Sequence, residues 1–131
     1  MKIKKIQLKH SSGPKSNQID AFDFDSRDQI NLGRSSDSHV QFETDNYTGV
    51  SRNHATINKQ GTDGHFTIMD NNSMNGVYVN GNRIEGEAEI FPGDTIQLGL
   101  KGPEFVFDLD PRPPGLEATK LMEVMPATQE V

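Results

Sequence analysis

The sequence contains no cysteine, which excludes a disulfide framework and a thiolate zinc site and leaves nothing that points to an oxidising compartment. It has no apolar run near the ~18 residues that a membrane span requires, and its start, MKIKKIQLKH, lacks the apolar stretch of a secretory signal. Positive charge is also scarce, because 13 Lys and Arg stand against 19 Asp and Glu, a net charge of −6. This balance disfavours non-specific binding to nucleic acid. We therefore expect a soluble, cytoplasmic protein that holds any anion through a local site.

The hydrophobic residues make up only 32 % of the 131 residues, yet they occur in short runs that alternate with polar residues. Alternation with a period of two predicts β-strands, and the Gly, Asn, Asp and Pro residues between the runs are typical of tight turns. About ten short strands at this spacing predict one all-β domain, a β-sandwich or a barrel. The alternating runs are KIQLKH, IDAFDFD, QINLGR, HVQFET, HATINKQ, HFTIMD, GVYVNG, DTIQLGL and EFVFDLD.

The pattern changes after the last of these runs, at the segment DPRPPG. Its three prolines cannot continue a strand ladder, and the adjacent pair favours an extended spacer. Beyond this segment, Leu121, Val124 and Met125 recur at helical spacing. We therefore place the folded domain at residues 1–110, followed by a Pro-containing linker and flexible C-terminal tail at residues 111–131.

Polar motifs stand in three of the segments between predicted strands. They are a Gly-Arg pair at Gly33 and Arg34, the sequence SRNH at Ser51–His54, and two Asn-Gly turns that begin at Asn75 and Asn80. Each step from one motif to the next crosses a strand or two. In a β-sandwich these loops could therefore gather at one end.

In this order and at these spacings, the motifs resemble the forkhead-associated (FHA) domain. The matching segments are LGRSSD, VSRNHATI, NNSMNGVYVNGNRI and FPGDTIQLG, and the resemblance is close over residues 30–100. It implies a β-sandwich of about eleven mostly antiparallel strands that binds phosphothreonine peptides through loops at one end. The implied function is that of an adaptor, which recognises partner proteins phosphorylated by a Ser/Thr kinase, without an enzymatic activity or a cofactor.

The resemblance also implies which residues contact the phosphopeptide. Arg34 is expected to supply an arginine fork for the phosphate, because its planar guanidinium matches a dianion with two parallel hydrogen bonds. Ser51 is expected to add a hydroxyl donor, whereas phosphate contact and a packing role both remain open for Arg52. The carboxamide of Asn75, a donor and an acceptor together, is expected to pair with the main chain of the ligand.

The remaining motif residues are expected to build the loops rather than to touch the ligand. His54 would support the loop that carries the serine from behind. Gly33, Gly76 and Gly81 would serve positions that need a positive φ or a close approach of the backbone, and Asn80 would form the second Asn-Gly turn.

One position departs from the family pattern. The residue before Asn75 is Met74, where the family commonly has a threonine whose hydroxyl often adds a contact on the phosphate side of the site. Methionine cannot donate that hydrogen bond. We expect either a lower affinity for phosphate or a more apolar pocket beside the phosphothreonine.

Other uses of the same side chains have less support in the sequence. Ser51 and His54 could form a nucleophile and a base, but no G-x-S-x-G elbow and no acid to orient the histidine accompany them. His10, His39, His54 and His65 lack the spacing of metal ligands, and DFDSRD lacks the central Gly and terminal Glu of a calcium loop. We therefore expect no catalysis and no metal.

Two further hypotheses concern partners. Some members of the family act as phosphate-independent scaffold components of larger assemblies, such as secretion systems, and this chain could do the same. The resemblance implies selection by the residue three positions after the phosphothreonine. In the tail, Val131 stands three positions after Thr128 and Met122 three positions after Thr119, so both threonines are candidate phosphosites. A phosphorylated tail could occupy the site of its own chain or of another, whereas an unmodified tail predicts a monomer.

Overall fold

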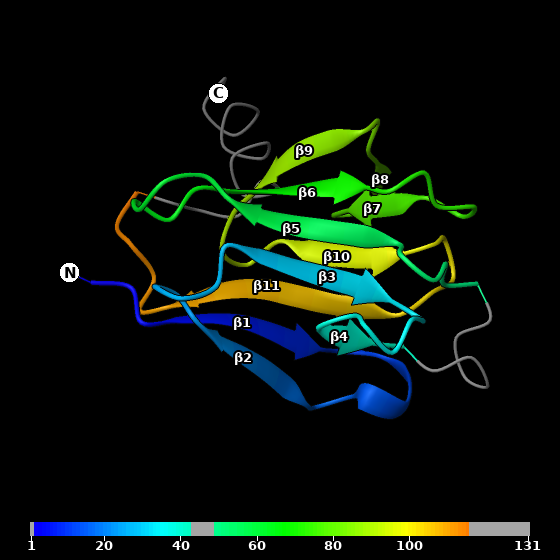
Figure 1. The fold of residues 1–131 in the computed structure, drawn as a ribbon, viewed down its shortest axis with the longest axis horizontal. Coiled ribbons are helices and arrows are strands. Elements are labelled where there is room, and N and C mark those ends of the chain that lie inside the picture. The colour runs from blue at the N-terminus through cyan, green and yellow to red at the C-terminus, as the bar shows by residue number, and fades with distance from the viewer. Residues whose placement is uncertain (1, 43–48, 116–131) are drawn as a thin grey trace, which may run out of the picture.

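The computed structural model describes residues 2–42 and 49–115, which form eleven strands in two sheets packed face to face (Figure 1). One sheet has the order β2-β1-β11-β10-β7-β8 and the other β4-β3-β5-β6-β9. Strands β3 and β4 pair in parallel, and the other pairs are antiparallel. The elements are β1 Lys5–His10, a 3-10 turn at Gly13–Lys15, β2 Ile19–Asp23, β3 Gln29–Gly33, β4 Val40–Gln41, β5 Ala55–Lys59, β6 Phe66–Asp70, β7 Val77–Val79, β8 Asn82–Arg83, β9 Glu87–Ile90, β10 Thr95–Leu98 and β11 Glu104–Asp110.

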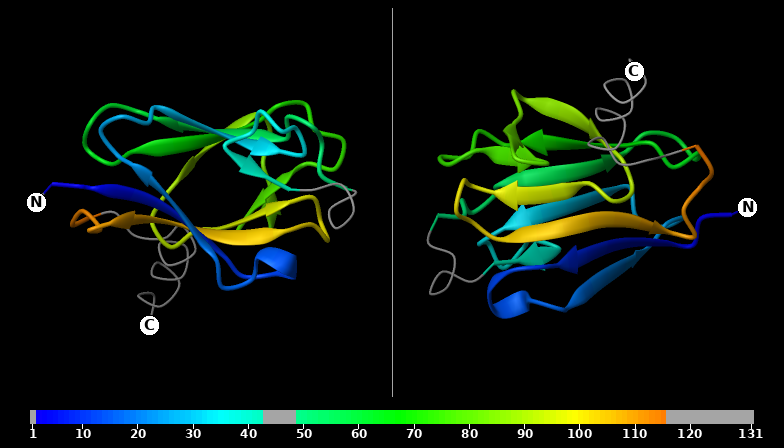
Figure 2. Two further views of the ribbon diagram at one scale, coloured as in Figure 1. Left: turned by 60° about the horizontal axis from the view of Figure 1, so that its bottom comes forward. Right: turned by 180° about the vertical axis from the view of Figure 1, so that it is seen from behind.

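The two sheets lie one above the other (Figure 2), and the core between them is filled by the alternating apolar residues. In β1, for example, Ile6 and Leu8 are fully buried, while Lys5, Gln7 and Lys9, which alternate with them, are more exposed. Phe66 of one sheet meets Phe107 of the other edge to face, with 5.2 Å between ring centroids. Each such side chain stabilises the fold by about 1.5–3 kcal/mol. The all-β domain predicted from the period-two runs is therefore confirmed, and of the two architectures left open, sandwich and barrel, it is the sandwich.

The short strands β8 and β9 were not among the predicted runs. Both residues of β8 are exposed, and β9 alternates over only four residues, EAEI, of which only Ile90 is a large apolar residue, so neither carries a strong strand signal. They form because neighbours offer backbone partners: β9 pairs with β6 and β8 with β7. Part of the run HVQFET forms β4, and its last two residues lie outside the described part of the chain.

The loop β3–β4, the segment before β5, and the loops β6–β7 and β10–β11 lie at one end of the sandwich, away from the N-terminus (Figure 1). The Gly-Arg pair, the SRNH motif and the first Asn-Gly turn each occupy one of these connections, as the motif order predicts. The second Asn-Gly turn, at Asn80, instead joins β7 to β8. No helix among the described residues has both the length and the apolar character that crossing a membrane requires.

A polar network closes the turn after β7 without taking part in that loop cluster. The carboxamide of Asn80 donates to Asp94, which is fully buried, and accepts from the backbone N–H of Thr95. The other carboxylate oxygen of Asp94 accepts from the N–H of Phe91. The second Asn-Gly turn, with Asn80 and Gly81 both at positive φ, is thus held by the Gly-Asp turn that follows β9.

The last strand ends at Asp110, and the chain just beyond it remains attached to the sheet. Arg112 donates two hydrogen bonds, of 2.7 and 3.1 Å, to the carboxylate of Asp108, and Lys9 donates a third. Burial raises the pKa of Asp108, but these bonds outweigh it, so that its pKa lies below its ordinary value. The linker and tail predicted for residues 111–131, with Thr119 and Thr128, lie mostly outside the described residues and stay a prediction.

Candidate functional site

The loop cluster encloses a shallow hollow of about 160 Å³. All five residues predicted to contact a phosphopeptide line it, although they come from three separate connections. The backbone of the segment before β5 completes the lining, a contribution that the motif pattern did not indicate. The lining residues are Arg34, Gly49, Val50, Ser51, Arg52, Met74 and Asn75.

Arg34 stands directly after β3 and is held by the neighbouring loop. Its backbone N–H donates to the carbonyl of Ser51 at 3.1 Å, and its Nε donates to the carbonyl of Val50. The side chain is half-buried. These two bonds place the guanidinium in the lining of the hollow and restrict its rotamers, so that less entropy is lost when it binds an anion.

Gly33 permits this close approach. A Cβ added at Gly33 would stand 2.0 Å from the carbonyl oxygen of Arg52 and 3.0 Å from that of Ser51. No larger side chain fits between the end of β3 and this backbone. Of the two roles that the sequence allowed for Gly33, the structure shows the close approach of two backbone segments. Gly33 does not have a positive φ.

The hydroxyl of Ser51 faces the loop β6–β7. Its Oγ accepts a hydrogen bond from the backbone N–H of Met74 at 3.2 Å. No described residue accepts the hydroxyl proton, so Ser51 keeps one donor for a ligand in the hollow.

His54 is fully buried behind this serine and connects two loops. Its Nδ1 accepts from the backbone N–H of Ser51 at 3.0 Å, so the proton of the neutral ring lies on Nε2, which donates to the carbonyl of Gly76 at 2.7 Å. Burial lowers the pKa of His54, and this effect outweighs the opposing influence of the Gly76 carbonyl and of Asp70. The imidazole is therefore neutral and has both nitrogens engaged.

This geometry also bears on the catalytic hypothesis. The contact between His54 and Ser51 runs to the backbone nitrogen of the serine and not to its hydroxyl. A ring nitrogen that already accepts an amide proton cannot serve as the general base for the same residue's Oγ. The arrangement is that of a structural support.

Asn75 is exposed at the rim, and its side chain is oriented by the opposite loop. Its Nδ2 donates to the carbonyl of Gly49 at 2.7 Å, and no described residue donates to its carboxamide oxygen. The following residue, Gly76, has a φ of +85°, and a Cβ there would stand 2.6 Å from Nε of Arg83. The turn that presents Asn75 thus depends on a left-handed conformation that glycine adopts readily.

The remaining predicted contacts reach solvent at the rim. Met74 is 86 % exposed and Arg52 is exposed, while Asn80 and Gly81 lie outside the lining of the hollow. Among the residues that the structure describes, the lining includes two arginines and no acidic side chain. The hollow is thus suited to an anion, although the chain as a whole is acidic.

Histidines and acids are dispersed over the rest of the fold. His10 contacts Asp20 at 2.7 Å, and His65 contacts Glu89 at 2.9 Å. Within residues 2–42 and 49–115, no group of three or more His, Asp or Glu side chains is placed to hold a metal ion.

The fold and the hollow together define a β-sandwich module with a ligand site built from loops at one end. The sequence profile of the FHA domain matches residues 30–99, and the chain belongs to this family. FHA domains are binding modules rather than enzymes.

The chain is also similar in sequence and structure to individual known proteins. The human E3 ubiquitin-protein ligase RNF8 is 49 % identical over 53 residues, which are 39 % of this chain and 11 % of that protein. The match to such relatives is thus confined to a small part of their length. Among solved structures, Mycobacterium tuberculosis EmbR in complex with a low-affinity phosphopeptide has a TM-score of 0.66 at 27 % identity, covering 80 % of this chain and 24 % of that one. A structure from a structural and functional analysis of phosphothreonine-dependent FHA domain interactions has a TM-score of 0.64 at 26 % identity. The match covers 79 % of this chain and 95 % of that one.

Proposed function

We propose that this chain is a phosphothreonine-dependent adaptor that binds partner proteins after a Ser/Thr kinase has phosphorylated them. The observation that carries the proposal is the convergence of Arg34, Ser51 and Asn75 on one hollow. The solved structures described above as binding a phosphopeptide or as phosphothreonine-dependent support it, since they share the fold.

The phosphate interacts with the basic side of the hollow. Arg34 supplies a fixed positive charge, and the hydroxyl of Ser51 donates its free proton, while Arg52 adds charge at the rim. Each hydrogen bond to a charged group contributes roughly 1.5–3 kcal/mol. Two such bonds are enough to make the phosphorylated peptide bind far more tightly than its bare hydroxyl form.

Asn75 sets the position of the peptide. Because its Nδ2 is engaged by the carbonyl of Gly49, the carboxamide oxygen is oriented and accepts an N–H from the main chain of the ligand. This contact aligns the peptide without reading its sequence, so that side-chain selectivity must come from the rim.

Binding of a phosphothreonine peptide library, measured by fluorescence anisotropy, tests the proposal. We expect a clear preference for phosphorylated over unphosphorylated peptides, which Arg34→Ala abolishes. Lys4→Ala is the matched control, because it removes an exposed cation outside the hollow. Circular dichroism should show that both variants are folded. Equal binding of both forms of the peptides by the wild-type protein would overturn the proposal.

Met74 favours a second candidate, a phosphate-independent scaffold role in a larger assembly. It leaves the loop β6–β7 without the hydroxyl that the family commonly places there. Under this alternative, a partner binds the unphosphorylated surface, and Arg34→Ala leaves that binding intact. The same anisotropy series distinguishes the two functions.

A further inference from the structure

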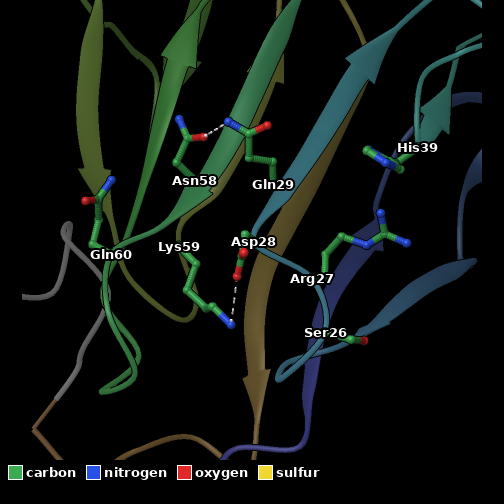
Figure 3. A pocket seen from close by; sticks show the side chains of 8 residues that line it. All are labelled: Ser26, Arg27, Asp28, Gln29, His39, Asn58, Lys59 and Gln60. Atoms are coloured by element: carbon green, nitrogen blue, oxygen red, sulfur yellow. Dashed lines mark hydrogen bonds and ion pairs between the residues drawn. The ribbon is translucent and has the colours of Figure 1, made fainter.

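A second recess, of about 710 Å³, opens on the outer face of the sheet that contains β3 and β5 (Figure 3). It lies where β3 begins, whereas Arg34 follows the end of that strand. Its lining is entirely polar, and we call it the Arg27 recess. The residues that line it are Ser26, Arg27, Asp28, Gln29, His39, Asn58, Lys59 and Gln60.

Arg27 brings a cation without a counter-ion to this recess. Its guanidinium lies 5.5 Å from the ring centroid of Phe22, and the side chain is half-buried. Among the described residues, no carboxylate lies within ion-pair distance of Arg27, and none accepts a hydrogen bond from its guanidinium. A stacked, half-buried guanidinium has lost part of its rotamer freedom before any ligand binds.

His39 adds a neutral donor beside Arg27, as Figure 3 shows. Its Nδ1 accepts from the backbone N–H of Asn31 at 2.9 Å, so the neutral ring carries its proton on Nε2. Burial, and then the charge of Arg27, lower the pKa of His39. At neutral pH the ring is therefore an uncharged N–H donor.

The acid in the lining, Asp28, is largely exposed and forms an ion pair with a lysine of the same recess. Asp28 lies 3.4 Å from Nζ of Lys59, which also donates to the carbonyl of Phe24 at 2.6 Å (Figure 3). Lys59 is mostly buried and joins the end of β5 to the loop before β3. Since Lys59 and Asp28 offset each other, the net positive charge of the recess comes from Arg27. The chain as a whole has a net charge of −6.

The outer face of the sheet is polar between the recess and the hollow. Because side chains alternate, Gln29 and Asn31 of β3 face outward while Ile30 and Leu32 enter the core. Gln41 of β4 continues this surface and donates to the carbonyl of Arg34. The five residue steps from Gln29, where β3 begins, to Arg34, directly after its end, span about 16 Å, a distance that about five residues of extended peptide also cover.

We propose that the Arg27 recess binds an acidic segment of the same partner that presents the phosphothreonine, about five to seven residues away from it along the peptide. Aspartate or glutamate carboxylates of that segment pair with Arg27 and accept from Nε2 of His39. The bivalent arrangement rests on the proposed function, whereas the binding of carboxylates in the recess does not.

The test uses phosphothreonine peptides that carry three glutamates five to seven residues before or after the phosphothreonine, and matched peptides with three glutamines. One acidic peptide should bind about threefold to fivefold more tightly than its glutamine counterpart, the range of exposed charge pairs. Arg27→Gln should remove this gain. Lys4→Gln, which makes the same charge change on an exposed residue elsewhere, should retain it.

Two outcomes would overturn the proposal: no gain from glutamates on either side, or equal losses in Arg27→Gln and Lys4→Gln. If the wild-type protein binds no phosphopeptide at all, the proposed function fails, and the result does not bear on the recess. The recess is then tested alone with an unphosphorylated glutamate-rich peptide by NMR. Shifts at Gln29 and His39 but not at Ser51 support the recess, and an absence of shifts refutes it.

Discussion

Nε2 of His54 donates a hydrogen bond to the carbonyl of Gly76 at 2.7 Å, and through this bond the two loops that carry Ser51 and Asn75 share one buried support. The same ring accepts the N–H of Ser51, so the two sides of the hollow are positioned by a single side chain. The geometry of the proposed phosphopeptide site therefore depends on a residue that contacts no ligand.

Replacing this support should cost both stability and binding. In His54→Ala, two buried backbone groups lose their partners, at roughly 1–3 kcal/mol each. We expect urea denaturation to show a loss of about 2–4 kcal/mol in the free energy of unfolding, with weaker phosphopeptide binding by the folded fraction. His65→Ala, at a partly exposed histidine, is the control and should change stability little. A loss no larger than that of the control would contradict the structure.

The lowered pKa of His54 predicts a pH dependence of stability. In the folded protein this pKa lies below the ordinary 6.5, so the unfolded chain binds a proton first as the pH falls. The stabilising contribution of the neutral ring is complete above about pH 6.5 and is lost as the pH falls from there toward the folded pKa. Urea midpoints measured between pH 7.5 and 5.5 should therefore decrease.

Two variants test whether His54 causes this pH dependence of stability. His54→Asn should flatten it, whereas His39→Gln should retain most of it, although the pKa of His39 is also lowered. Asp108 does not interfere, because its lowered pKa affects stability only near and below its ordinary value of 3.8. An unchanged slope in His54→Asn would show that His54 is not the titrating group.

Comparing Gly33→Ala with Gly81→Ala should distinguish the effect of a steric clash between two backbone segments from the effect of a positive φ. The added Cβ would meet the carbonyl oxygen of Arg52 at 2.0 Å, so β3 and the following loop must move apart. We expect a loss of about 1–3 kcal/mol and reduced phosphopeptide binding. Gly81→Ala, at a φ of +85° with open space around it, should cost about 1–2 kcal/mol and leave binding unchanged. Wild-type affinity in Gly33→Ala would contradict the proposed role of this contact.

Met74→Thr tests the departure from the family pattern. The backbone N–H of residue 74 still reaches Ser51 in this variant, and the new hydroxyl adds a donor at the rim of the hollow. A hydrogen bond to the charged phosphate contributes roughly 1.5–3 kcal/mol, which corresponds to an affinity at least about tenfold higher. Met74→Val, which has a similar shape without the hydroxyl, controls for size. Tighter binding by both variants would assign the gain to shape.

Much of this architecture follows from local sequence pattern. Alternating runs such as KIQLKH specify strands because one face of each is buried, and the motif loops are recognisable because only certain residues suit their turns. The order of the motifs indicated that their loops could gather at one end, and the resemblance to the FHA domain implied that Arg34, Ser51 and Asn75 share one site. These are properties of short segments, which a sequence displays directly.

The tertiary structure decided what depends on partners distant in the chain. Strands β8 and β9 form because β7 and β6 offer backbone partners. His54 is neutral because burial lowers its pKa, and its ring is oriented by the carbonyl of Gly76, 22 residues away. The Arg27 recess is likewise formed by loops and strands that only folding brings together. Long-range pairing and desolvation arise from the packed chain, and no local pattern encodes them.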